Sequence, residues 1–314
     1  MGIPTFPLPV YNPFPGGVDL GTVVVMPTGS NVIYCRSTGP QSADSPALTG
    51  KLVSTLAAAI AQCRSGLYDT VVCLPGHSES VATSTMLSGL VAGTRIIGVG
   101  RGGNMPVFRW TATGSKWSIA VADVVIHGLR LRMEGASGVV LGIDVRAADV
   151  RISGCDIELT SGASNKATVG IEVGLLGTRA EIVGNRFRGL STTAVADGVL
   201  VSAVLDGVRI TDNEMIFASG TTSGNIRFGA VAATNSLVSR NQLANTVAAS
   251  TACIAYGAAA MTGICSHNNM SVLADNTASA QGVTFGAGAL IRCFENYCTD
   301  EANKSGILAP AAGT

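Results

Sequence analysis

The sequence predicts an all-β chain folded as a single-stranded, right-handed parallel β-helix, and two observations predict it. An apolar residue with a second apolar residue five positions later recurs about every 28 residues through most of the 314-residue chain. A second apolar column, with residues two apart as in a strand with one buried face, runs beside the first. No part of the repeat keeps a 3.6-residue period. Each unit therefore contains strands and turns, as one coil of a solenoid does.

The first column defines the register of the repeat. Ile96 marks an early turn, and the later turns follow at steps of 26 to 30 residues. We expect about eight turns, which at about 4.8 Å per turn form a rod of roughly 35 Å. The anchors, each with its partner five positions on, are Ile126/Leu131, Ile152/Ile157, Ile182/Phe187, Ile210/Met215, Val238/Leu243, Cys265/Met270 and Cys293/Cys298.

The second column supplies the other inward-facing strand of each turn. Its members are Ile143, Ile171, Val199, Ile226, Ile254 and Val283, each with another apolar residue two positions on. Glycine precedes four of the six, at Gly142, Gly170, Gly198 and Gly282.

The position three after the anchor is asparagine on five successive turns. In a stacked turn the asparagine side chain tolerates a left-handed backbone and can bond to the asparagine of the next turn. We therefore predict a structural ladder and no catalytic role for Asn185, Asn213, Asn241, Asn268 and Asn296.

Four parts of the chain are expected: an arm over 1–30, an N-terminal cap over 31–93, the β-helix over 94–299 and a tail over 300–314. In the cap, Ser45 and a stripe of Leu48, Leu52, Leu56 and Ile60 predict a helix over 46–63, flanked by strands at 32–35 and 70–74. The tail is expected to fold over the last coil or to contact another subunit.

Five prolines in the first 17 residues exclude a regular helix or central strand from the arm. A disordered tail is one interpretation. We favour an extended arm that docks on a partner, because apolar anchors are available at Phe6, Val10, Tyr11 and Phe14.

Composition excludes several classes of function. The chain has zero net charge and 13% charged residues, so it lacks the basic stripe that nucleic-acid binding requires. It shows no basic signal region and no apolar run long enough for a membrane helix, so we expect a soluble protein made in a cytoplasm. Few charges beside 47% hydrophobic residues suggest a surface covered by protein in an assembly.

Few residues suggest chemistry. His77, His127 and His267 have no neighbours that form a triad or metal site, so surface or turn positions are expected, with no cofactor and no metal. The eight cysteines contain no CxxC pair. They are either reduced, buried thiols or form disulfides after release from the cell. Residues 98–103, GVGRGG, fit a dinucleotide fingerprint by accident, because Pro106 and a strand-like run follow in place of a helix.

One carboxylate pair is a candidate for a catalytic or cation site. Asp144 and Glu172 share an offset on neighbouring turns, but Leu200 and Arg227 follow there, so a surface role is expected. Surface contacts are likewise expected for the outward arginines before three anchors, Arg151, Arg209 and Arg292.

Three stretches carry a family resemblance: LAAAIAQCRSGLYDTVVCLPGHSESV, TRIIGVGRGGNMPVFRWTATG and VVIHGLRLRM. They resemble the opening of right-handed β-helix proteins of the pectate-lyase-like superfamily, most closely the versions that tailed bacteriophages encode as virion proteins. The resemblance covers residues 31–133 by motif and the rest by repeat pattern. The superfamily's polygalacturonase motifs (paired aspartates, GHG and RIK segments) and the acidic calcium cluster of pectate lyases are missing from this sequence.

The resemblance implies a homotrimer located in a virion and assembled in the host cytoplasm. We expect a non-enzymatic capsid decoration (cement) protein whose arm binds the major capsid protein or another virion protein. The alternative is a tail spike or fibre that binds or degrades host surface polysaccharide. No nucleic acid, membrane or cofactor is expected as a partner.

Overall fold

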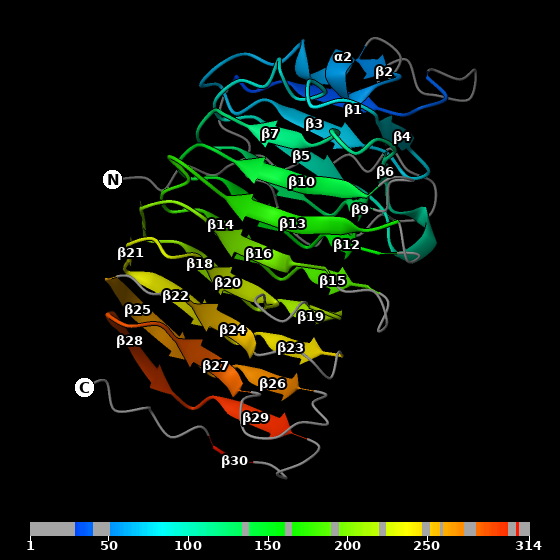
Figure 1. Ribbon diagram of the computed structural model, residues 1–314. Coiled ribbons are helices and arrows are strands. Elements are labelled where there is room, and N and C mark those ends of the chain that lie inside the picture. The colour runs from blue at the N-terminus through cyan, green and yellow to red at the C-terminus, as the bar shows by residue number, and fades with distance from the viewer. Residues whose placement is uncertain are drawn as a thin grey trace, which may run out of the picture.

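The computed structural model of the chain describes residues 29–39, 51–133, 138–160, 165–189, 195–219, 224–246, 252–257, 260–272, 281–300 and 306–307. These residues form an all-β parallel solenoid of about seven turns with almost no helix (Figure 1). The predicted fold class is confirmed, with about one turn fewer than expected. The turns stack in chain order from β1 to β29, with β2 at the outer edge beside β1 and β30 at the outer edge beside β29.

Three sheets form the wall of the solenoid. Sheet A contains, in spatial order, β2 Leu52–Val53, β1 Val32–Cys35, β3 Thr70–Cys73, β5 Arg95–Gly98, β8 Val125–His127, β11 Arg151–Ser153, β14 Glu181–Val183, β18 Arg209–Thr211, β22 Ser236–Ser239, β25 Met261–Ser266 and β28 Ala289–Phe294.

Sheet B contains β4 Ser78–Val81, β6 Val107–Trp110, β9 Arg130–Arg132, β12 Asp156–Glu158, β15 Arg186–Arg188, β19 Glu214–Phe217, β23 Gln242–Asn245, β26 Asn269–Val272, β29 Tyr297–Asp300 and, antiparallel to it, β30 Gly306–Ile307. Sheet C contains β7 Trp117–Ile119, β10 Val139–Val145, β13 Ala167–Val173, β16 Asp197–Val201, β20 Ile226–Phe228, β24 Ala252–Tyr256 and β27 Gln281–Phe285. Two short strands, β17 Leu205–Asp206 and β21 Ala233–Thr234, pair between two turns.

The predicted register is confirmed in all three sheets. In sheet A every anchor pairs with the next one, from Ile96 through Ile126 to Cys293. The partners five positions on pair in sheet B, and the second column pairs in sheet C. The sheet A stack also extends upstream, because Val71 pairs with both Ile33 and Ile96. The expected cap region therefore already contributes strands to the wall.

The core lies inside the coil and is built from these stacked columns. Almost every inward anchor is fully buried. Aromatic rings pack in the core of the first turns, where the ring of Trp117 contacts both Phe108 and Trp110. Near the other end the rings of Phe228, Tyr256 and Phe285 stack, with centroids 4.9 Å and then 5.5 Å apart.

Close approach between turns explains the glycines before the second column. A Cβ atom on Gly142, Gly170 or Gly198 would lie 2.6 to 2.7 Å from a carbonyl oxygen of the following turn. Real Cβ atoms do not approach so closely, so any larger residue would push neighbouring turns apart.

The helix predicted over 46–63 is wrong in its extent. The structure has a helix, α2, over Leu56–Ile60, with the Thr55 side chain accepting a hydrogen bond from the Ala58 amide. Leu52 belongs to strand β2 and pairs with Tyr34 of β1, while Ser45 and Leu48 lie outside the described residues. Apolar residues spaced four apart fit one face of a helix and also one face of a strand. Their spacing therefore cannot show that Leu52 belongs to a strand that pairs with the open edge of β1. The strands expected at 32–35 and 70–74 are confirmed as β1 and β3.

The terminal segments are largely outside the described residues. This holds for the arm as far as residue 28, including Phe6, Val10, Tyr11 and Phe14, and for most of the tail over 300–314. Among the described residues, no helix is long and apolar enough to cross a membrane.

Candidate functional site

The five asparagines form one continuous hydrogen-bonded ladder. The Oδ1 atom of each later asparagine accepts from the amide and from the Nδ2 atom of the asparagine one turn before, at 2.9 to 3.1 Å. Each Nδ2 atom also donates to the carbonyl of an anchor one turn back, at 2.7 to 3.0 Å. At the head of the ladder, the Cys155 amide donates to Asn185 Oδ1.

The ladder is closed to ligands. All five side chains are 1–2% exposed, and their polar atoms are used within the protein. The structural role of Asn185, Asn213, Asn241, Asn268 and Asn296 stays a prediction, and this geometry is the basis for it.

The left-handed backbone expected at the asparagines lies one residue earlier. On seven successive turns the residue directly before the ladder position has a φ between 52° and 70°. These residues are Gly128, Gly154, Gly184, Asp212, Arg240, His267 and Glu295. The expectation was wrong by one position, because the asparagine needs its side chain turned inward while its predecessor makes the turn.

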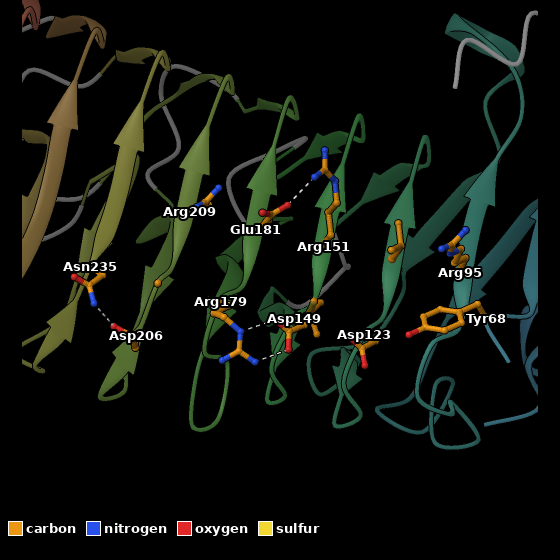
Figure 2. A pocket seen from close by; sticks show the side chains of 13 residues that line it. Tyr68, Arg95, Asp123, Asp149, Arg151, Arg179, Glu181, Asp206, Arg209 and Asn235 are labelled. Atoms are coloured by element: carbon orange, nitrogen blue, oxygen red, sulfur yellow. Dashed lines mark hydrogen bonds and ion pairs between the residues drawn. The ribbon is translucent and has the colours of Figure 1, made fainter. Parts of the chain in front are cut away.

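The outward face of sheet A carries a cavity of about 590 Å³, shown in Figure 2. It runs across several turns at the edge where the chain enters sheet A. Its lining mixes both signs of charge with one aromatic ring: Tyr68, Arg95, Asp123, Val125, Asp149, Val150, Arg151, Arg179, Glu181, Asp206, Gly207, Arg209 and Asn235.

A column of left-handed residues forms one side of this cavity. Each lies three positions before an anchor of sheet A, with φ between 52° and 83°. The column consists of Tyr68, Gly93, Asp123, Asp149, Arg179, Gly207 and Asn235. This spacing was readable from the repeat, and it is the signal by which sequence reasoning could have found the cavity residues that it missed.

Ion pairs between adjacent turns organise the charges (Figure 2). Arg179 donates to both carboxylate oxygens of Asp149, at 2.7 and 2.5 Å, and Arg151 donates to Glu181 at 2.6 Å. The Asp206 carboxylate accepts from Thr234 Oγ1 and Asn235 Nδ2, both at 2.7 Å. Arg95 lies over the ring of Tyr68, 5.5 Å from its centroid.

These contacts set the protonation of the cavity acids. The hydrogen bonds from Arg179 lower the pKa of Asp149, and those from Thr234 and Asn235 lower the pKa of Asp206. A glycosidase needs a carboxylic acid whose pKa is raised so that it can protonate the leaving group. Hydrogen bonding shifts the pKa of Asp149 and of Asp206 in the opposite direction, so neither carboxylate suits the role of general acid.

The candidate pair Asp144 and Glu172 does lie on neighbouring turns in register. Asp144 is 1% exposed, so its expected surface position is wrong; Lys116 and Arg146 each approach one of its oxygens at 2.7 Å. Glu172 accepts from the Ser202 hydroxyl at 2.5 Å. Each carboxylate has its own partners. Arg151, Arg209 and Arg292 are exposed, as expected.

The three histidines differ from one another. His127 is half-buried beside Ser153 Oγ at 3.0 Å, and burial lowers its pKa. His267 lies in an exposed turn and pairs with Glu295. His77 also lies in a turn, but its side chain is completely buried, so a surface position is wrong for it.

His77 contacts Cys35 and Glu79 in the first turns of the solenoid. A hydrogen bond from Cys73 lowers the pKa of Cys35 to about 6. Burial disfavours a charged His77, but hydrogen bonds to Cys35 and Glu79 outweigh it and raise the pKa of His77 to about 9. All eight cysteines of the chain are free thiols in the structure, five of them buried.

A second cavity of about 620 Å³ lies on the same face over the last turns, between Arg209 and Arg292. Its lining includes Leu237, Ile264 and Leu290, of which Leu290 is 71% exposed. Two more large apolar side chains, Phe294 and Tyr297, are exposed on the same turns. Apolar surface of this kind is typical of a contact with another protein.

Comparisons of the chain with protein-family models, with curated proteins and with solved structures give no match.

Proposed function

We propose that this chain is a non-enzymatic structural protein of a bacteriophage virion, a homotrimeric capsid decoration protein attached through its N-terminal arm. The observation that carries the non-enzymatic part is the state of the acids in the sheet A cavity. Asp149 and Glu181 are held by arginines one turn away, and the pKa values of Asp149 and Asp206 are lowered. Placement in a virion is supported by the sequence resemblance of residues 31–133.

The apolar surface of the last turns supports assembly with further copies of the chain. Leu290 is 71% exposed at the second cavity, where a neighbouring subunit can cover it. We expect Leu290→Asp to convert the trimer into monomers, measured by light scattering after size-exclusion chromatography. Leu175→Asp is the matched control, since Leu175 is 70% exposed on a turn before β14. A trimer that survives Leu290→Asp places the subunit contact elsewhere.

Attachment through the arm has a separate test. Deletion of residues 1–17 should abolish binding to capsids that lack the protein, while circular dichroism and light scattering show an unchanged folded trimer. Full capsid binding by the truncated chain would refute the arm as the anchor. Imaging the labelled protein on particles distinguishes capsid from tail.

The second candidate function is a tail spike or fibre that binds host polysaccharide. The sheet A cavity favours it, because Tyr68 brings a partly exposed aromatic ring to the cavity and Arg209 has no ion-pair partner among the described residues. Incubation with host polysaccharide decides between the two. Binding that Arg209→Ala weakens, or the release of fragments, would favour the spike.

A further inference from the structure

Three metal-binding side chains, those of Cys35, His77 and Glu79, converge at the first turns of the solenoid, at the blue end of Figure 1. Cys35 ends β1 and Cys73 ends β3, and the two residues are paired in register. Both are completely buried, so their thiols face the core side by side.

His77 and Glu79 approach this pair from the turn that follows Cys73 and from sheet B. The backbone of His77 is fixed by hydrogen bonds to Leu74 and from Val107, at 3.1 and 2.8 Å. Its ring packs against Phe108, with centroids 5.2 Å apart. Glu79 belongs to β4, and its Oε2 atom also accepts from the Leu56 amide at 2.8 Å.

The distances fit a tetrahedral zinc site. Cys35 Sγ lies 3.7 Å from His77 Nδ1 and 3.9 Å from Nε2, and Nε2 lies 3.1 Å from Glu79 Oε2. Zinc bonds of about 2.3 Å to sulfur and about 2.0–2.2 Å to nitrogen and oxygen give tetrahedral edges of about 3.6 Å for S···N and about 3.4 Å for N···O. One ligand atom from each of Cys35, His77 and Glu79 lies within 4.8 Å of the others. These side chains therefore need only small shifts to bind one ion together.

The chemistry of the donors points to the same ion. Thiolate and imidazole ligands favour zinc over magnesium or calcium, which prefer oxygen. One thiolate and one carboxylate balance the charge of Zn²⁺, so the filled site is neutral and can be buried. A catalytic cysteine triad is a poorer interpretation, because Cys35 is 0% exposed and no substrate can reach it.

We propose that Cys35, His77 and Glu79 are the protein ligands of a structural zinc site. The site joins sheet A to sheet B within the first turns, where the solenoid lacks a preceding turn. The Leu56 amide holds the Glu79 carboxylate in place, as outer partners do for metal ligands. The proposal does not depend on the function proposed above.

Cobalt substitution of the full-length chain tests the site. The purified protein is stripped with a chelator and titrated with Co²⁺ alone. We expect one equivalent per chain, with a thiolate-to-cobalt charge-transfer band and the intense visible bands of tetrahedral cobalt. Elemental analysis of protein expressed with zinc should give one zinc per chain.

Variants identify the ligands. Cys35→Ser should remove the charge-transfer band or weaken it strongly, and Glu79→Gln should weaken zinc affinity by at least about tenfold. Glu79→Gln keeps the proposal testable if Cys35→Ser fails to fold. Cys155→Ser is the matched control, because Cys155 is another buried free thiol, in the ladder column of a later turn. Less than about 0.2 equivalents of cobalt in the wild type, or an equal loss in Cys155→Ser, would overturn the proposal.

Discussion

Removal of one asparagine from the middle of the ladder tests whether the ladder holds the turns together. In Asn213→Ala the Asn185 amide loses its acceptor, Asn213 Oδ1, which lies 2.9 Å away. The Ile182 carbonyl loses a donor at 2.8 Å. A buried donor left without a partner costs about 1–3 kcal/mol, and the lost hydrogen bond to Ile182 adds about 0.5–1.5 kcal/mol. We expect the free energy of unfolding to fall by about 2–4 kcal/mol.

Guanidinium denaturation monitored by circular dichroism measures this loss as a shift of the midpoint. Glu214→Ala is the control on the same turn. Glu214 is the next residue, and its pair with Arg186 at 3.2 Å is solvent-exposed. Such a pair contributes about 0–1 kcal/mol.

Asn213→Asp separates the two halves of the side chain. An aspartate keeps an oxygen toward Asn185 but replaces the Nδ2 donor that faces Ile182 O and Asn241 Oδ1. A buried carboxylate facing two acceptors is costly, so this variant should be less stable than Asn213→Ala. The ladder would lose its structural role if Asn213→Ala were no more destabilising than Glu214→Ala.

Two further predictions concern an acid at the first turns and the glycines of sheet C. The fully buried side chain of Asp69 accepts hydrogen bonds from Arg64, which lower its pKa to about 2. The interaction with Arg64 therefore stabilises the fold fully at pH values above about 4, the pKa of aspartate in the unfolded chain. This stabilisation is lost as the pH falls through 2. Asp69→Asn should cost about 1–2 kcal/mol at pH 6, a figure reduced for the exposure of Arg64, and denaturation curves of the two proteins should converge toward pH 2; a constant difference would refute the linkage. Gly170→Ala should cost about 1–3 kcal/mol, because the new Cβ would lie 2.7 Å from Gly198 O. A Cβ atom on Gly184 would lie in open space, but φ there is 64°, so we expect Gly184→Ala to lower the free energy of unfolding by only about 1 kcal/mol. Thermal unfolding compares the two variants, and equal losses of stability would contradict the packing argument.

Stacking explains why the sequence is sufficient to predict the wall of the solenoid. Each residue of a turn packs on its counterpart one turn away, so the same chemical requirement recurs at the same offset. Ile96, Ile126 and Ile152 can therefore be aligned by their spacing in the sequence, and all three pair as expected. The asparagine ladder is readable for the same reason.

The first turns keep no regular spacing, and there the strands at 32–35 and 70–74 were predicted correctly but the extent of the helix was not. The apolar residues Leu52 and Leu56 fit either one continuous helix or a strand followed by a short helix. The chain forms the second, because β2 pairs with the otherwise open edge of β1. The convergence of Cys35, His77 and Glu79 is likewise hidden in the sequence. It arises from the pairing of two strands that are 38 residues apart in sequence, a spacing that recurs nowhere else in the described part of the chain.

The turn before the ladder shows how charge and backbone strain offset one another. Glycine occupies the left-handed position at Gly154 and Gly184, whereas Asp212 and Arg240 occupy it on the next two turns. A left-handed conformation costs a residue with a side chain roughly 1–2 kcal/mol. The Arg240 guanidinium donates to both carboxylate oxygens of Asp212 at 2.7 Å, which offsets part of that cost. Glycine avoids the strain but carries its own entropic cost of roughly 0.5–1 kcal/mol, and both solutions occur in one column. The ladder position one residue later holds Leu129 and Cys155 on the first turns of this column and asparagine after them. Asparagine's acceptor and two donors are all used there, and asparagine fills that position on every turn from Asn185 onward.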